Sequence, residues 1–188
     1  MKNRPVRVIL GTSGVLLLLQ LAEGLPFALN VTPSIPRGLY WRTGRKPHQG
    51  EYVAACLTTG DALRMGIERG YFIRSRSCDS GAAPLLKVLA AKRGNAVRWQ
   101  SDGVWIDGVR WPDSTPQAKD PSGRPMPTVK GEKVLLPGEV VLLGESEASY
   151  DGRYFGEVVP SSVEALEMII TWEVLKDLVT ALKALVAW

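Results

Sequence analysis

Ser34 has the setting most suited to chemistry, because two prolines enclose it in the segment PSIP, residues 33–36. Each proline fixes its own φ near −65° and disfavours helical geometry in the residue before it. The serine hydroxyl is therefore confined to a stiff, non-helical turn. A hydroxyl held in this way suits a nucleophile, and a linker between a membrane anchor and a domain is the alternative interpretation.

A serine nucleophile needs a base to take its proton. The only histidine, His48, lies in the polar segment RKPHQGE, which is typical of a solvated surface turn. Lysine is the known substitute for histidine, provided that its amine is neutral when it accepts the proton. Lys87 fits this requirement, because its aliphatic neighbours in LLKVL (85–89) would desolvate the amine in a strand and lower its pKa. A lysine that reaches solvent from a strand edge is the alternative.

An apolar segment precedes Ser34. From Val8 to Leu29 only Glu23 is charged, and a helix of this length would cover about 33 Å, close to the thickness of the hydrocarbon core. We expect residues 1–29 to form a cytoplasmic tip and a single transmembrane helix, with the basic residues of the tip inside. The remainder would then lie on the far side of the membrane. A cleavable signal peptide is the alternative.

Cys56 and Cys78 are the only cysteines of the chain. Together with one histidine they do not supply four zinc ligands unless carboxylates contribute, and we expect no metal or cofactor. An oxidising exterior would let the pair close a disulfide, whereas two unpaired core cysteines are the alternative. The net charge of +4 is modest and long runs of like charge are missing, so the sequence gives no support for nucleic-acid binding.

The central part of the chain has period-2 apolar patterns bounded by Gly and Pro, which predict a mainly β domain over residues 30–160. A short helix over 61–69 and a long surface loop over 112–131 interrupt it. Ser161 and Glu164 form a capping-box pattern, which predicts an amphipathic helix over 161–188 that lies on the membrane or packs on the domain. The strands are expected at residues 51–57, 84–91, 96–100, 103–108 and, as a pair, within 132–144.

Three motifs resemble the signal peptidase I clan in order and spacing: TPSIPRGLYW (32–41), LLKVLAAKRGN (85–95) and LLGESEASYDGRYFGEV (142–158). The first is most similar to TraF-type peptidases of conjugative plasmids, whose signature is Pro-Ser-Met-Pro-Arg-Gly-Leu-Tyr. The resemblance covers residues 30–160 and implies a signal-peptidase-like, β-rich catalytic domain. Ile35 replaces the usual methionine, which conserves volume. Other departures, Arg93-Gly94-Asn95, Glu145-Ser146 and Gly152, lie beside the matched positions.

The resemblance implies a role for each matched residue. Ser34 matches the nucleophile and Lys87 the general base of a Ser/Lys dyad. Ser149 matches a serine that orients the lysine amine. Asp151 and Arg153 match a buried acidic and basic pair, and Asp151 also matches an aspartate that TraF-type enzymes are thought to need for catalysis.

The function implied is a membrane-anchored serine endopeptidase that removes leader or terminal segments from an exported, membrane-embedded precursor such as a pre-pilin. The backbone N–H of Ser34 and the hydroxyl of Thr32 are candidates to stabilise the oxyanion. Water would resolve the acyl-enzyme by cleavage, and an amine of the same substrate would close a cyclic pilin; the sequence leaves both outcomes open. The implied location is a bacterial inner membrane, with the catalytic domain on the periplasmic side. The expected partners are the bilayer, the precursor and components of a conjugation or type IV secretion apparatus. The alternatives are a general signal peptidase I and a non-catalytic, membrane-anchored assembly factor of such an apparatus.

Overall fold

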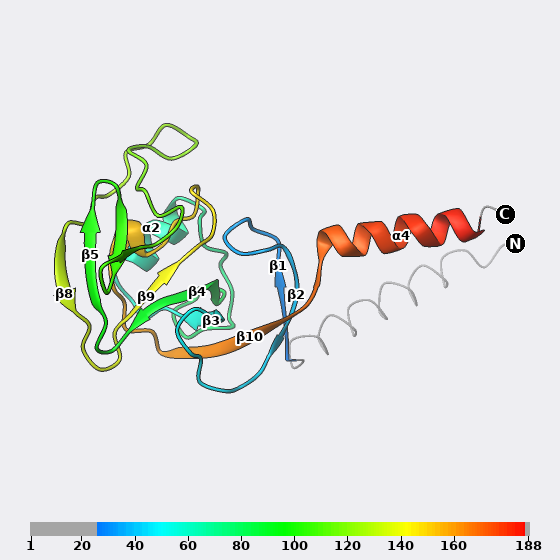
Figure 1. Cartoon of the computed structure of the whole chain (residues 1–188), viewed down its shortest axis with the longest axis horizontal. Helices are drawn as coiled ribbons and strands as arrows, with labels where there is room; N and C mark the ends of the chain where they lie inside the picture. The colour runs from blue at the N-terminus through cyan, green and yellow to red at the C-terminus, as the bar shows by residue number, and fades with distance from the viewer. Residues whose placement is uncertain (1–25, 187–188) are drawn as a thin grey trace, which may run out of the picture.

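The computed structural model describes residues 26–186, which fold mainly as antiparallel β-structure (Figure 1). Among these residues one sheet has six strands in the order β1-β2-β10-β3-β4-β9, and a second has four in the order β7-β6-β5-β8. Three helices, α2 (Asp61–Glu68), α3 (Gly152–Phe155) and α4 (Trp172–Val186), complete the described part. The strands are β1 Phe27–Asn30, β2 Gly38–Arg42, β3 Tyr52–Cys56, β4 Leu85–Lys92, β5 Ala96–Gln100, β6 Gly103–Ile106, β7 Val109–Arg110, β8 Gly131–Val134, β9 Val140–Leu143 and β10 Ser162–Thr171.

Strand β4 lies inside the larger sheet, between β3 and β9. Its pairing with β3 sets Lys87 opposite Val53, and its pairing with β9 begins at Val88. Side chains on both faces of β4 are buried, as the continuous aliphatic pattern of LLKVLAA predicts. Because both faces of β4 pack in the core, the Lys87 side chain lies in apolar surroundings.

The smaller sheet packs against the larger one through a shared apolar core. Val97, Trp99 and Val104 of the smaller sheet contact Val141 and Leu143 of β9 and are nearly inaccessible to solvent. Trp99 also donates its indole N–H to the carbonyl of Gly152 at 2.9 Å, which fixes the start of α3. The second sheet therefore supports the loop that follows β9.

The predicted strands at 51–57, 84–91, 96–100 and 103–108 are confirmed as β3 to β6, and the 132–144 segment contains β8 and β9. The turn at 101–102 joins β5 to β6, as the Ser-Asp-Gly signal predicts. The predicted helix at 61–69 corresponds to α2, within one residue at its end. Local patterns were sufficient for these elements: β5 alternates between exposed and buried residues, whereas β4 is buried almost throughout, as its continuous aliphatic run predicts.

The predicted helix over 161–188 is wrong for its first part. Ser162–Thr171 form strand β10, which pairs with β2 on one side and β3 on the other. The expected capping residues have other partners: the Ser161 hydroxyl donates to the carbonyl of Cys56, and Glu164 forms an ion pair with Arg42. Pairing on two strand edges outweighs the local helix signal, and the helix begins only at Trp172.

The predicted membrane span over 8–29 lies mostly outside the described residues. Its last part is corrected, because residues 27–29 belong to β1 and pair with β2, with Phe27 opposite Trp41. No helix within residues 26–186 has both the length and the apolar character needed to cross a bilayer.

Helix α4 continues directly from β10 and extends away from the two sheets (Figure 1). Several of its apolar side chains are exposed, among them Val174, Leu178 and Leu182. Its first residue is tied to the domain: the Trp172 backbone N–H donates to the Arg37 carbonyl at 3.0 Å, and its indole N–H donates to the Asn30 carbonyl at 3.2 Å. The helix is thus joined to the turn that carries Ser34.

Candidate active site

Ser34 and Lys87 meet in the interior of the domain. Ser34 lies in the turn between β1 and β2, whereas Lys87 lies in β4, yet Lys87 Nζ is 2.6 Å from Ser34 Oγ. The two residues are 8% and 5% exposed, respectively. The arrangement combines a hydroxyl with an amine that water does not surround.

Burial changes the acidity of the Lys87 amine. Desolvation lowers its pKa from 10.5 to about 8; the negative charge of Asp151 opposes this shift and the positive charge of Arg153 adds to it. Desolvation dominates because an ammonium ion loses hydration in apolar surroundings. A substantial fraction of the amine is therefore neutral at a mildly alkaline pH, the form that can accept a proton from a hydroxyl.

Asn30 organises the turn that carries Ser34. Its side-chain amide donates to the carbonyl groups of Thr32 (2.9 Å), Ile35 (2.8 Å) and Pro36 (3.1 Å). Its Oδ1 accepts from the backbone N–H of Thr32, and the side chain is buried. Asn30 is not among the residues that the sequence patterns predict for the site. The available signal was a polar residue at the end of an apolar segment, directly before a proline-rich turn, where asparagine commonly bonds to local backbone.

Thr32 lies at the edge of the site. Its hydroxyl donates to Asn30 Oδ1 at 2.9 Å, and the residue is exposed. To stabilise an oxyanion, this hydroxyl would have to rotate away from Asn30. The candidate role therefore requires a change of hydrogen-bond partner.

The loop after β9 closes over the turn. The backbone N–H of Glu145 donates to the Ser34 carbonyl at 2.7 Å, and the Ser149 hydroxyl donates to Ser34 Oγ at 3.4 Å. Gly144 permits this approach: a Cβ there would overlap the Ser149 side chain and lie 2.9 Å from the Ser34 carbonyl oxygen. The resemblance implies that Ser149 orients the amine of Lys87. In the structure its hydroxyl instead forms a hydrogen bond with Ser34 Oγ.

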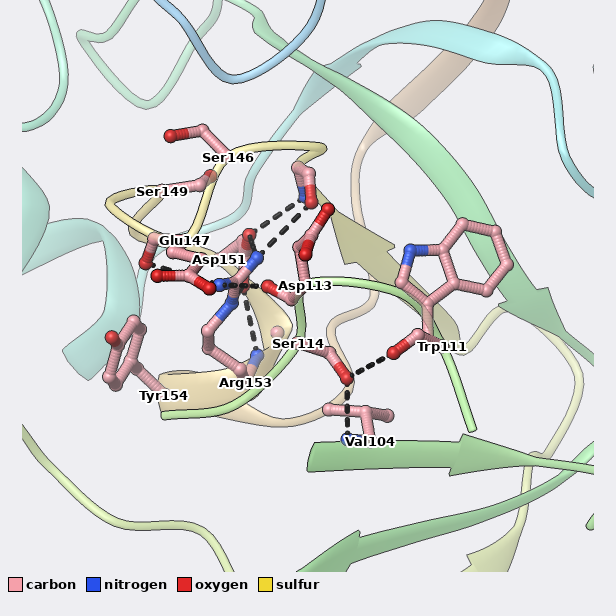
Figure 2. A network of polar contacts seen from close by, with 12 residues as sticks. Val104, Trp111, Asp113, Ser114, Ser146, Glu147, Ser149, Asp151, Arg153 and Tyr154 are labelled. Atoms are coloured by element: carbon pink, nitrogen blue, oxygen red, sulfur yellow. Dashed lines mark hydrogen bonds and ion pairs between the residues drawn. The ribbon is translucent and has the colours of Figure 1, made fainter. Parts of the chain in front are cut away.

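Asp151 and Arg153 form a buried ion pair below this loop (Figure 2). The Asp151 carboxylate accepts from Arg153 Nε at 2.9 Å and Nη2 at 3.0 Å, and also from the backbone N–H of Gly144 at 2.8 Å. Arg153 donates in turn to the carbonyls of Asp113 (2.7 Å) and Glu147 (3.2 Å). Each charge is compensated by its partner and by backbone groups, as a buried pair requires.

These contacts define what Asp151 does in the structure. Its hydrogen bonds hold Gly144 and Arg153, so that it fixes the loop bearing Ser149, and its charge raises the pKa of Lys87. The resemblance predicts a catalytic role for Asp151. That role stays a prediction. In this structure the carboxylate bonds to the loop and to Arg153, and it acts on the Lys87 amine only through space.

A cleft of about 130 Å³ opens beside Ser34 and Lys87. Residues 29–32 form one wall and residues 83–86 another, whereas Tyr71, Phe72 and Ile73 form a third. The third wall is fastened by a hydrogen bond from the Ala83 N–H to the Ile73 carbonyl, 2.8 Å long.

The predicted disulfide between Cys56 and Cys78 is confirmed. It closes the segment that contains Tyr71–Ile73, and it joins the end of β3 to the approach to β4. The bond thus constrains the third wall of the cleft from both of its ends.

The remaining candidates for chemistry lie elsewhere. His48 is exposed in the turn before β3, where its backbone N–H donates to Glu51. Within the described part of the chain, three or more His, Cys, Asp or Glu side chains nowhere gather in a way that could hold a metal ion.

The site thus brings a buried serine and a buried lysine to hydrogen-bond distance within an antiparallel β domain. The chain matches the family model described as signal peptidase, peptidase S26, over residues 6–172. It therefore belongs to the peptidase S26 family.

The similar curated proteins carry names from plasmid transfer. A plasmid transfer protein TraF from Escherichia coli is 34% identical over 168 residues, which cover 88% of this chain and 94% of that protein. A conjugal transfer protein TraF from Agrobacterium fabrum is 36% identical over 171 residues, covering 88% and 95%. A solved signal peptidase I from Enterococcus faecalis aligns with 68% of this chain and 98% of its own, with 19% identity and a TM-score of 0.33.

Proposed function

We propose that this protein is a membrane-anchored serine endopeptidase of conjugative transfer, which matures a pilin precursor with Ser34 as nucleophile and Lys87 as general base. The observation that carries the proposal is the 2.6 Å distance between Lys87 Nζ and Ser34 Oγ at a buried position. Membership of the peptidase S26 family supports the type of chemistry. The names of the TraF relatives support the link with conjugation.

In the first step, the neutral Lys87 amine accepts the proton of the Ser34 hydroxyl while the oxygen attacks the scissile carbonyl carbon. The carbonyl oxygen becomes an oxyanion, for which the Ser34 backbone N–H and the Thr32 hydroxyl are the proposed donors. The Ser149 hydroxyl, 3.4 Å from Ser34 Oγ, orients the nucleophile before the attack.

In the second step, Lys87 returns its proton to the departing amine nitrogen, and the C–N bond breaks to leave an ester on Ser34. Water then attacks the ester carbonyl and gives a free carboxylate. Attack by an amine of the same substrate instead forms a new amide and a cyclic product. In both cases Lys87 accepts the proton of the attacking group, and Ser34 regains its own.

The substrate is expected to bind as an extended strand. Strand β1 pairs with β2 on one edge only. Residues 85–87 of β4 pair with β3, and their other edge is unpaired because the pairing of β4 with β9 begins only at Val88. The backbone edges of both segments face the cleft and are available to a peptide. The cleft volume of about 130 Å³ favours a small apolar side chain next to the scissile bond.

We further propose an inner-membrane location with the domain on the periplasmic side. The disulfide supports an oxidising compartment. The apolar sequence before residue 26 supports a single-pass anchor that aligns Ser34 with precursors embedded in the same bilayer. Components of a conjugation apparatus are the proposed partners.

Co-expression with candidate pre-pilins tests the proposal. The wild type should remove the leader, Ser34→Ala and Lys87→Ala should not, and Lys46→Ala, which changes an exposed lysine, serves as the control. Intact mass then separates the outcomes, because a cyclic product is lighter than the linear one by one water. Broad processing of unrelated preproteins would favour a general signal peptidase, and full maturation with Ser34→Ala would indicate a non-catalytic assembly factor.

A further inference from the structure

A second cavity, of about 290 Å³, adjoins the catalytic cleft. Tyr71 lines both cavities. Glu147 and Ala148, which directly precede Ser149, form part of the second cavity. The two cavities thus meet beside the residues that contact Ser34, although Ser34 and Lys87 line only the first.

The far wall of this cavity is the 112–131 loop, and it is held firmly. The Asp120 side chain, 2% exposed, accepts from the Tyr71 hydroxyl at 2.5 Å and from Arg124 Nε at 2.6 Å. Arg69 donates to the carbonyl of Pro125 at 2.8 Å. These bonds fix the 112–131 loop to Arg69 and Tyr71. The cavity is therefore largely formed before a ligand arrives.

The lining is aromatic and apolar on the inside and charged at the rim. Tyr71, Tyr150 and Tyr154 stand together with Met126, while Lys119 and Glu147 are exposed at the edge. Tyr71 and Tyr150 are in contact, with ring centroids 4.8 Å apart. Such a lining suits a large apolar or aromatic side chain whose backbone remains near water.

The position of Ser34 assigns each half of a substrate to one cavity. The residue whose carbonyl is attacked must lie in the cleft that Ser34 lines, and the chain before it runs along the free edges of β1 and β4. On the other side of Ser34, the Ser149 hydroxyl contacts Ser34 Oγ, and Glu147 and Ala148 of the second cavity directly precede Ser149, so a chain that leaves on this side passes Ser149 and Tyr71. This path enters the second cavity.

We propose that the second cavity binds the part of the substrate that follows the scissile bond, and that it selects a large apolar or aromatic side chain there. This inference rests on the proposed peptidase function. An amine that attacks the acyl-enzyme approaches from the side on which the first amine left, so the same cavity receives the attacking segment when a cycle is formed.

Two synthetic peptides with the same sequence before the scissile bond test the assignment. One ends after the bond in glycinamide, and the other continues for several residues that include phenylalanine. Ala148→Phe and Lys119→Phe, placed on two different walls at exposed positions, should fill the cavity. Ala96→Phe, an exposed position on the smaller sheet, is the matched control.

We expect both filling variants to raise KM for the long peptide roughly tenfold, the loss that follows when one apolar contact is removed, and to leave kcat unchanged. Cleavage of the glycinamide peptide should equal that of the wild type in every variant. Equal effects on both peptides, or no effect on either, would overturn the cavity assignment and leave the peptidase intact. If the wild type cleaves neither peptide, the proposed function itself fails, and the assignment with it.

Discussion

Lys87 Nζ lies 2.6 Å from Ser34 Oγ, although the two residues are 53 positions apart in the chain. Lys87→Met keeps the aliphatic volume but removes the amine, so we expect a loss of cleavage of about 10²–10⁴-fold with a normal fold. Peptide cleavage and circular dichroism measure the two properties. Lys46→Met, on the surface, should leave both unchanged, and a Lys87→Met protein with wild-type turnover would exclude Lys87 as the base.

Cleavage should depend on pH through the Lys87 amine. Its pKa of about 8 means that roughly one tenth of the amine is neutral at pH 7, and kcat/KM should rise about tenfold per pH unit below that pKa. Above a pH of about 8 the rate should become constant. Initial rates between pH 6 and pH 9.5 provide the measurement. A flat profile over this range would show that Lys87 does not titrate in the rate-limiting step.

The same amine affects stability. Because its pKa falls from 10.5 to about 8 on folding, the unfolded chain binds more protons between these values, and stability increases as the pH rises through this interval. Below pH 8 the full cost of burying the charged Lys87 amine reduces the free energy of unfolding, by about 3 kcal/mol for a shift of this size. Lys87→Met should therefore be more stable than the wild type at pH 7, and the difference should shrink towards pH 10.5. Urea unfolding at both pH values measures it, and a constant difference would contradict the shift.

Asp151→Asn should have two separable effects. It leaves the buried Arg153 without its charge partner, which we expect to destabilise the fold by about 3–5 kcal/mol. It also removes the charge that raises the pKa of Lys87, so the alkaline rise in activity should move to lower pH. Urea unfolding and the pH profile report the two effects separately.

The matched control for Asp151→Asn is Asp61→Asn, which changes an exposed aspartate paired with Arg64 on α2. This variant should alter neither stability nor the pH profile. A shift of the Asp151→Asn profile to higher pH would argue against the electrostatic coupling.

The disulfide should contribute both to stability and to substrate binding. It closes a loop of 22 residues, for which the chain-entropy model gives about 3 kcal/mol. The Cys56→Ser/Cys78→Ser protein should unfold at a lower temperature and bind peptide more weakly, because the Tyr71–Ile73 wall is released. Thermal unfolding and KM test this, and reductant should affect the wild type but not the double variant. An unchanged KM would show that the Tyr71–Ile73 wall does not depend on the disulfide for its position.

Some features of this structure can be predicted from local sequence patterns, whereas others depend on pairing between strands that are distant in the sequence. The buried position of Lys87 follows from LLKVLAA, and the stiff turn of Ser34 follows from its two prolines. Strand β10 could not be predicted in the same way, because its amphipathic pattern also fits a helix and only the edges of β2 and β3 decide between them. Long-range pairing regularly overrides a propensity of this size.

The site shows the same division. Ser34 and Lys87 are conspicuous because of their own neighbours, whereas the function of Asn30 depends on where three carbonyl groups of the turn converge. Gly144 is likewise explained only by the approach of Ser149 from five residues further along the chain. Neither relationship has a periodic signature, so the sequence alone did not single out either residue.

The two hydrogen bonds donated by Trp172 have a mechanical consequence. They end on the carbonyls of Arg37 and Asn30, which flank the turn that carries Ser34. A force applied along α4, by whatever holds that helix, is therefore delivered to the backbone on both sides of Ser34. Shortening the chain after Thr171 would therefore remove two hydrogen bonds that brace the turn of Ser34, as well as the terminal helix.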